Sequence, residues 1–174
     1  MNHISNVKIS FTIEKPLLWK ESIIEKCELN NVNPPIKKKN IIVFKYKYTF
    51  CIFEKKNNSL HFNVSGIKHY EEVQNFHIFF KIFFPNSIIL NLKIDNLTAT
   101  FNVKQRLNLL KLYNLSEKVK YNPERFPGLF LKDCGKTCLI FKNGKIIILG
   151  CKTKIEVCET WQNVLKKILN VIII

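Results

Sequence analysis

The stretch YNPERFPGLFLKDCGKTCLIFKNGKIIILGCK, residues 121–152, contains three extended apolar runs joined by two tight turns. The turns fall at residues 133–135 and 143–144, and the second is Asn-Gly, a strong short-range hairpin signal. Side chains of a strand point alternately to its two faces, so every second residue shares a face. This rule predicts one apolar face formed by Thr137, Leu139, Phe141, Ile147 and Leu149.

Basic side chains border the predicted face. They are Lys132, Lys136, Lys142, Lys145 and Lys152. An apolar sheet face with a lysine border is unusual if it meets only water. It suits a partner that is flat, partly apolar and negatively charged.

The composition points to a folded, strongly basic protein. Apolar residues make up 47% of the 174 residues, which supports a core and excludes a disordered chain. The length fits one domain or two pseudo-symmetric halves. A net charge of +15 favours a polyanionic partner, nucleic acid first and an anionic membrane second. A genome rich in A and T accounts for most of the bias toward Lys, Asn, Ile and Phe, but not for ordered motifs.

Other classes of protein find little support. The chain has neither a secretory signal pattern nor a run of 18 apolar residues, and its last helix carries too few lysines on one face for membrane binding. Its six cysteines form no CxxC pair at zinc spacing, so we expect reduced thiols and no metal. It lacks a glycine-rich phosphate loop and a catalytic grouping around its four histidines. We expect no enzyme and no cofactor.

Two copies of one unit are visible in the chain. The segments beginning at Ile4, Asn33, Cys51 and Gly66 recur, about 84 to 90 residues later, at Ile94, Asn122, Leu139 and Gly150. This spacing predicts a diverged first repeat over residues 1–86 and a second repeat over residues 87–174.

Each repeat has the same predicted order of elements. The strands are expected at residues 4–13, 41–53 and 59–64, and again at 89–101, 129–131, 137–141 and 145–149. The helices are expected at residues 17–27, 69–83, 104–113 and 155–171. The last helix should bury Ile155, Cys158, Trp161, Leu165 and Ile168. Helices on one side of antiparallel strands indicate an α+β fold.

Ordered motifs carry a family resemblance. The segment NPERFPGL at residue 122, followed by LIFxxGK at 139 and GxK at 150, resembles the second repeat of the TATA-box-binding protein core, as does the strand at 90–103. The resemblance covers roughly residues 88–171 and is weaker in the first half. It implies a curved, ten-stranded antiparallel sheet, the saddle, with helices on its convex face.

The resemblance also implies a function and a set of contact residues. It implies a monomer on DNA that binds and bends A/T-rich duplex through the minor groove and recruits other initiation factors. Phe126 and Phe141 match one pair of wedging phenylalanines, and Phe53 matches one member of the other pair. Ile36 stands at the remaining position, thirty residues after Asn6 as Phe126 is after Asn96. Isoleucine is among the wedges that minor-groove proteins use.

Asn6 and Asn96 match a pair of central asparagines in the family. A·T and T·A pairs present similar acceptors in the minor groove, so an amide donor accepts either orientation. Lys8 and Ser65 make the first half more polar than the second. The full set of expected DNA contacts is Asn6, Lys8, Ile36, Phe53, Ser65, Lys68, Asn96, Thr98, Phe126, Pro127, Lys132, Leu139, Phe141, Lys145, Ile147, Leu149 and Lys152.

The expected protein partners follow from the same resemblance. Glu124 matches a position that meets transcription factor IIB in the family, with Arg125 as a divergent neighbour, and RNA polymerase subunits are further candidates. The expected location is the nucleus, or a viral transcription compartment if a large DNA virus encodes the chain. The alternative is a diverged protein of the same fold that uses its sheet or helices mainly for protein–protein interaction.

Overall fold

The computed structural model describes residues 3–172, and over these it contains ten strands and four α-helices. The strand order is β2-β3-β4-β5-β1-β6-β10-β9-β8-β7. Asn6–Asp95 forms one compact unit, here the N-terminal unit. The chain from Asn96 onward, with the start of β1 up to Ser5, forms the C-terminal unit. The expectation of an α+β fold with a ten-stranded sheet is confirmed.

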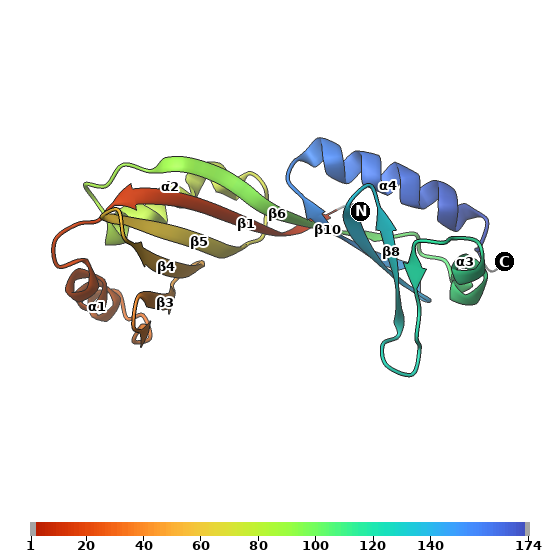
Figure 1. Cartoon of the computed structure of the whole chain (residues 1–174), viewed down its shortest axis with the longest axis horizontal. Coiled ribbons are helices and arrows are strands. Elements are labelled where there is room, and N and C mark those ends of the chain that lie inside the picture. The colour runs from red at the N-terminus through yellow and green to blue at the C-terminus, as the bar shows by residue number, and fades with distance from the viewer. Residues whose placement is uncertain (1–2, 173–174) are drawn as a thin grey trace. The chain divides into compact units, whose positions relative to one another are not determined.

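The first seven elements lie mainly in the N-terminal unit (Figure 1). They are β1 (His3–Glu14), α1 (Trp19–Leu29), β2 (Ile36–Lys38), β3 (Ile41–Lys45), β4 (Thr49–Lys55), β5 (Ser59–Ile67) and α2 (Glu72–Phe83). The other seven lie mainly in the C-terminal unit and are β6 (Leu90–Asn102), α3 (Leu109–Asn114), β7 (Val119–Lys120), β8 (Gly128–Asp133), β9 (Lys136–Phe141), β10 (Lys145–Cys151) and α4 (Lys154–Leu169).

A cluster of phenylalanines holds α2 against the N-terminal sheet. The rings of Phe11 and Phe62 stack at 4.8 Å on adjacent strands β1 and β5. Phe80 of α2 meets both of them edge-on, at 5.1 Å and 5.5 Å. Each such ring pair contributes about 0.5–1.5 kcal/mol beyond the burial of its area. One face of this sheet is therefore committed to α2.

Helix α4 covers one face of the C-terminal sheet in the same way (Figure 1). Thr153 caps its first turn by accepting a hydrogen bond from Glu156 N at 3.1 Å. Trp161 stacks on Phe101 of β6 with ring centroids 4.2 Å apart. The hairpin of β8 and β9 is also tied to the helix, because Asp133 accepts hydrogen bonds from Lys167 Nζ at 2.6 Å and Asn163 Nδ2 at 3.2 Å.

The predicted buried stripe of the last helix is wrong in part. The side chain of Ile155 is 71% exposed, and Cys158 is exposed too. The stripe that faces the sheet consists of Val157, Thr160, Val164 and Ile168. This helix has two overlapping apolar stripes. The orientation in which it packs on the sheet decides which of the two is buried.

Several predicted boundaries also differ. The helix expected from residue 104 begins at Leu109, because Lys104 has φ +55° and Asn108 caps the helix by accepting from Lys111 N. The long strand expected at 41–53 is interrupted between Lys45 and Thr49 into β3 and β4. The helix expected at 69–83 begins at Glu72, and the short edge strands β2 and β7 were not expected.

Within the described residues, no helix is long and apolar enough to cross a membrane. The same part of the chain holds no group of three or more His, Cys, Asp or Glu side chains placed to bind a metal ion.

Candidate nucleic-acid interface

The C-terminal unit leaves one sheet face uncovered by α4, here called its open face. Cys138, Ile140, Ile146 and Ile148 are fully buried and point to the other face. The alternate residues of the same strands are half-exposed, and they are Thr137, Leu139, Phe141, Ile147 and Leu149. The strand register places Leu139 opposite Ile147 and Thr137 opposite Leu149. The shared face predicted from the two-residue period is therefore confirmed.

Two phenylalanines meet at one end of this open face. The rings of Phe126 and Phe141 lie 5.8 Å apart in an edge-on arrangement, and both side chains are half-exposed. Phe130 joins them, with its ring 5.1 Å from that of Phe126. Because both side chains are half-exposed, both rings can reach a ligand on this face.

Gly128 makes room for this ring pair. It lies opposite Phe141 in the register of β8 and β9. A Cβ atom at this position would lie 2.6 Å from Phe126 Cε1 and 3.0 Å from Phe141 Cε1. Sequence reasoning missed Gly128 and Phe130 as site residues. The signal that could have found them is the hairpin register, which places Gly128 and Phe130 on the same face as Phe141.

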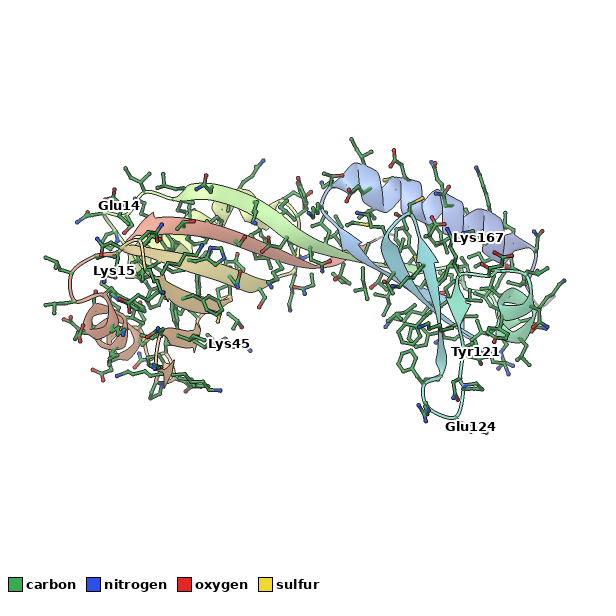
Figure 2. All side chains as sticks on the ribbon, in the orientation of Figure 1. Glu14, Lys15, Lys45, Tyr121, Glu124 and Lys167 are labelled. Atoms are coloured by element: carbon green, nitrogen blue, oxygen red, sulfur yellow. The ribbon has the colours of Figure 1, made fainter. Side chains whose placement is uncertain are left out.

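A seven-residue loop between β7 and β8 brings Phe126 to the sheet. Its turn is closed by Phe126 N, which donates to Asn122 O at 3.0 Å, while Asn122 Oδ1 accepts from Glu124 N at 3.2 Å. Glu124 lies at the tip of this loop, away from the strands (Figure 2). Glu124, Arg125 and Pro127 are all exposed.

The two central asparagines have equivalent environments. Asn96 Oδ1 accepts from Gly150 N at 2.8 Å, and Asn6 Oδ1 accepts from Gly66 N at 3.3 Å. Both glycines have positive φ, +92° and +89°, beside a register shift in the strand pairing. A backbone N–H can only donate, so each amide oxygen is fixed and each NH₂ group is oriented as a donor. Asn96 Nδ2 also donates to Thr98 Oγ1 at 3.2 Å.

The lysine border is only partly available to a ligand. Lys132, Lys145 and Lys152 are exposed in the C-terminal unit, and Lys68 is exposed in the N-terminal unit. Lys136 is not free, because its Nζ lies 3.0 Å from Glu156 Oε2 and 3.1 Å from Gly150 O.

The open face of the N-terminal unit is more polar. Phe53 is half-exposed and lies opposite His61, with ring centroids 6.3 Å apart. Asn63 and Ser65 follow His61 on the same face. Burial and the nearby Lys55 charge lower the pKa of His61 below its ordinary value, which favours the neutral imidazole. Sequence reasoning missed His61, which the strand register places between Phe53 and Thr12.

Lys8 adds a positive charge to this polar face. Burial raises the pKa of the Cys51 thiol, and the nearby charge of Lys8 partly opposes that rise. Ser10 is buried and donates to Asp95 Oδ1 at 3.0 Å.

The equivalence drawn between Ile36 and Phe126 is wrong in structural terms. Ile36 lies on strand β2 opposite Val43, and not in a loop. Only Lys39 and Asn40 connect β2 to β3, whereas residues 121–127 connect β7 to β8. Counting thirty residues from the asparagine failed because the two repeats differ in loop length. The residue opposite Phe53 is Ile41, as Gly128 is opposite Phe141.

Comparison with known proteins supports the resemblance in sequence and in fold. Residues 91–171 match the family model described as transcription factor TFIID, or TATA-binding protein. The TATA-box-binding protein of Sulfolobus acidocaldarius is 33% identical over 84 residues, which are 47% of this chain and 42% of that protein. The one from Pyrococcus furiosus is 38% identical over 66 residues, 37% of this chain and 35% of that protein. The matched part thus spans less than half the length of these relatives.

A solved structure extends the likeness to the fold of both units. The Methanococcus jannaschii TBP structure aligns with a TM-score of 0.76 and 23% identity, covering 98% of this chain and 99% of that one. The resemblance to the core domain of the TATA-box-binding protein family is therefore confirmed, by sequence over residues 91–171 and by fold over almost the whole chain.

Proposed function

We propose that the chain is a transcription initiation factor that binds A/T-rich duplex DNA through the minor groove and bends it. The observation that carries the proposal is the ring pair of Phe126 and Phe141, half-exposed on the apolar sheet face opposite the one that packs under α4. Apolar wedges of this kind unstack a base step at a cost of roughly a few kcal/mol, and the bend increases the contact area.

The other expected contacts have matching chemistry. The oriented NH₂ groups of Asn6 and Asn96 would donate to the N3 and O2 acceptors of A·T pairs. Leu139, Ile147 and Leu149 present apolar surface to the groove floor, while exposed lysines neutralise phosphates. The repeats at residues 1–86 and 87–174 would each supply one asparagine and one open face. In this proposal the protein acts as a monomer on DNA, in a nucleus or a viral transcription compartment, without a cofactor or catalysis.

The loop tip offers a contact for a protein partner. Glu124 and Arg125 are exposed on the seven-residue loop and take no part in the ring cluster. A transcription factor IIB-like protein or a polymerase subunit would bind there while the open faces hold DNA. Reversal of charge in Glu124→Arg should weaken assembly with such a factor and should not weaken binding to DNA.

A gel-shift and bend assay on an A/T-rich duplex tests the DNA-binding proposal. The wild type should bind and bend the duplex, and Phe126→Ala/Phe141→Ala should bind more weakly and bend less. Leu110→Ala is a matched control, because Leu110 is an exposed apolar residue on helix α3. Unchanged binding and bending by the double variant would refute wedging by these rings.

A second candidate function has one observation in its favour. The open face of the N-terminal unit carries Lys8, His61, Asn63 and Ser65, and its short β2–β3 turn provides no second aromatic ring beside Phe53. A face of this kind could serve a protein partner in place of DNA. Absence of DNA binding by the wild type would favour this alternative.

A further inference from the structure

The hairpin of β2 and β3 forms a basic edge on the N-terminal unit. Lys37, Lys38 and Lys39 are consecutive and all exposed. Strand β2 is the last strand of the sheet on this side and pairs only with β3. Its outer edge is therefore open to a partner.

The equivalent connection in the C-terminal unit, between β7 and β8, has a different structure. There, Phe126 lies two residues before Gly128, and its ring packs over that glycine against Phe141. In the N-terminal unit Ile41 replaces the glycine opposite Phe53, and the residue two positions earlier is Lys39. The position two residues before the strand residue opposite the phenylalanine is thus occupied by a lysine in this unit.

The charges of these lysines are not neutralised within the unit. The neighbouring carboxylate is Glu54, whose backbone N donates to Asn40 O at 3.1 Å. That carboxylate is engaged by Lys15 Nζ at 2.9 Å and Lys20 Nζ at 3.3 Å. Among residues 3–172, no recorded ion pair includes the three hairpin lysines, which are Lys37, Lys38 and Lys39.

We propose that Lys38, which lies opposite Ile41 on the open-face side of the sheet, and Lys39 in the turn bind DNA phosphates in place of an aromatic wedge, an inference that rests on the proposed DNA-binding function. The two units then hold DNA by different balances of forces. The C-terminal unit adds inserted apolar rings, a contact that depends little on salt, to the phosphate contacts of its own exposed lysines. The N-terminal unit displaces counterions from the phosphates, a contact that weakens steeply as salt rises. The kink should accordingly be concentrated at the half of the site that the C-terminal unit occupies.

The salt dependence of affinity tests this inference. Kd for an A/T-rich duplex is measured between 50 and 300 mM KCl for the wild type and for Lys38→Gln/Lys39→Gln. Each lost phosphate contact should reduce the slope of log K against log salt by about 0.9, so the double variant should lose about 2 units of slope. The bend angle of the bound duplex should not change. The matched double arginine variant should keep the wild-type slope.

Control variants separate this inference from the parent proposal. Lys111→Gln/Lys166→Gln changes exposed lysines on helices α3 and α4 and should leave the slope unchanged. Phe126→Ala should reduce the bend and leave the slope unchanged. The hairpin lysines could instead serve only to prevent the edge strand β2 from pairing with another chain. In that case their replacement would leave the slope of log K against log salt unchanged. An unchanged slope in the double glutamine variant, with normal binding by the wild type, overturns the inference alone. No binding by the wild type overturns the proposed function and this inference with it.

Discussion

Asn96 Oδ1 lies 2.8 Å from the backbone nitrogen of Gly150, and this bond fixes which end of the amide faces outward. The corresponding pair in the N-terminal unit, Asn6 and Gly66, has the same bond at 3.3 Å. In both pairs a glycine with positive φ turns its N–H toward the asparagine. The donor group of each asparagine is thus oriented before any ligand binds, which lowers the entropic cost of binding.

Replacing Asn96 with Asp should weaken selection of A/T-rich DNA. The carboxylate can still accept from Gly150 N, so the fold should be retained, but the donor toward the groove is lost. We expect the variant to lose about 1–3 kcal/mol of binding free energy on the A/T-rich duplex. The difference in binding free energy between this duplex and a G/C-substituted duplex should therefore become smaller. Competition binding with the two duplexes measures this. A wild-type preference in the variant would exclude Asn96 as a determinant of sequence.

Gly128→Ala should disturb the ring pair without touching a hydrophobic core. The new methyl group would lie 2.6 Å from Phe126 Cε1, so the ring must move. Overpacking of this kind costs about 1–3 kcal/mol of stability, and less where a half-exposed ring can swing away. We therefore expect a small fall in unfolding free energy and a larger fall in DNA bending. Gly135→Ala is the control, because a Cβ atom at this position would have no other atom within 4 Å. The positive φ of this residue would still strain the backbone. A normal bend in Gly128→Ala would contradict the role given to the ring pair.

The link between Asp133 and Lys167 should make stability depend on pH. Burial raises the pKa of Asp133, but hydrogen bonds from Lys167 and Asn163 outweigh it and hold that pKa below its ordinary value. A carboxyl with a depressed folded-state pKa contributes stability above its unfolded pKa, and loses it as pH falls through the folded value. The wild type should therefore lose stability below about pH 4.

Asp133→Asn isolates this contribution. The variant should be less stable than the wild type at pH 7, by about 1–3 kcal/mol, because Lys167 loses its charged partner. The gap should narrow as the pH is lowered. Urea unfolding at pH 7 and at pH 3 gives both values. A gap of equal size at the two pH values would show that the charge of Asp133 does not stabilise the fold.

The orientation of α4 predicts unequal effects of truncating two apolar residues on the same helix. Val164 is fully buried against the sheet, and Val164→Ala should cost about 2 kcal/mol. Ile155→Ala removes more atoms, but its side chain is 71% exposed, and we expect a change within about 0.5 kcal/mol. Thermal or urea unfolding measures both. A larger loss for Ile155→Ala would mean that the originally predicted stripe is the buried one.

The sequence by itself determined the features that depend on local periodicity and turn chemistry. Strict alternation assigned Leu139 and Phe141 to the face opposite Ile140, because a strand has no other way to place successive side chains. The Asn-Gly turn fixed the pairing of β9 with β10. The repeated asparagine and glycine motifs identified Asn6 and Asn96 as equivalent. The family resemblance, carried by ordered motifs, supplied the arrangement of ten strands.

Only the tertiary structure decided the features that depend on contacts between distant segments. The place of Ile36 follows from its pairing with Val43, and counting along the chain cannot reveal a two-residue turn where the other repeat has a seven-residue loop. Lys136 looks like any border lysine in the sequence, yet the fold brings it to Glu156. The buried stripe of α4 was chosen by the sheet on which the helix packs. In each case the stabilising interaction is made with a residue or strand that is distant in the sequence. Local sequence patterns do not specify which residue or strand that is.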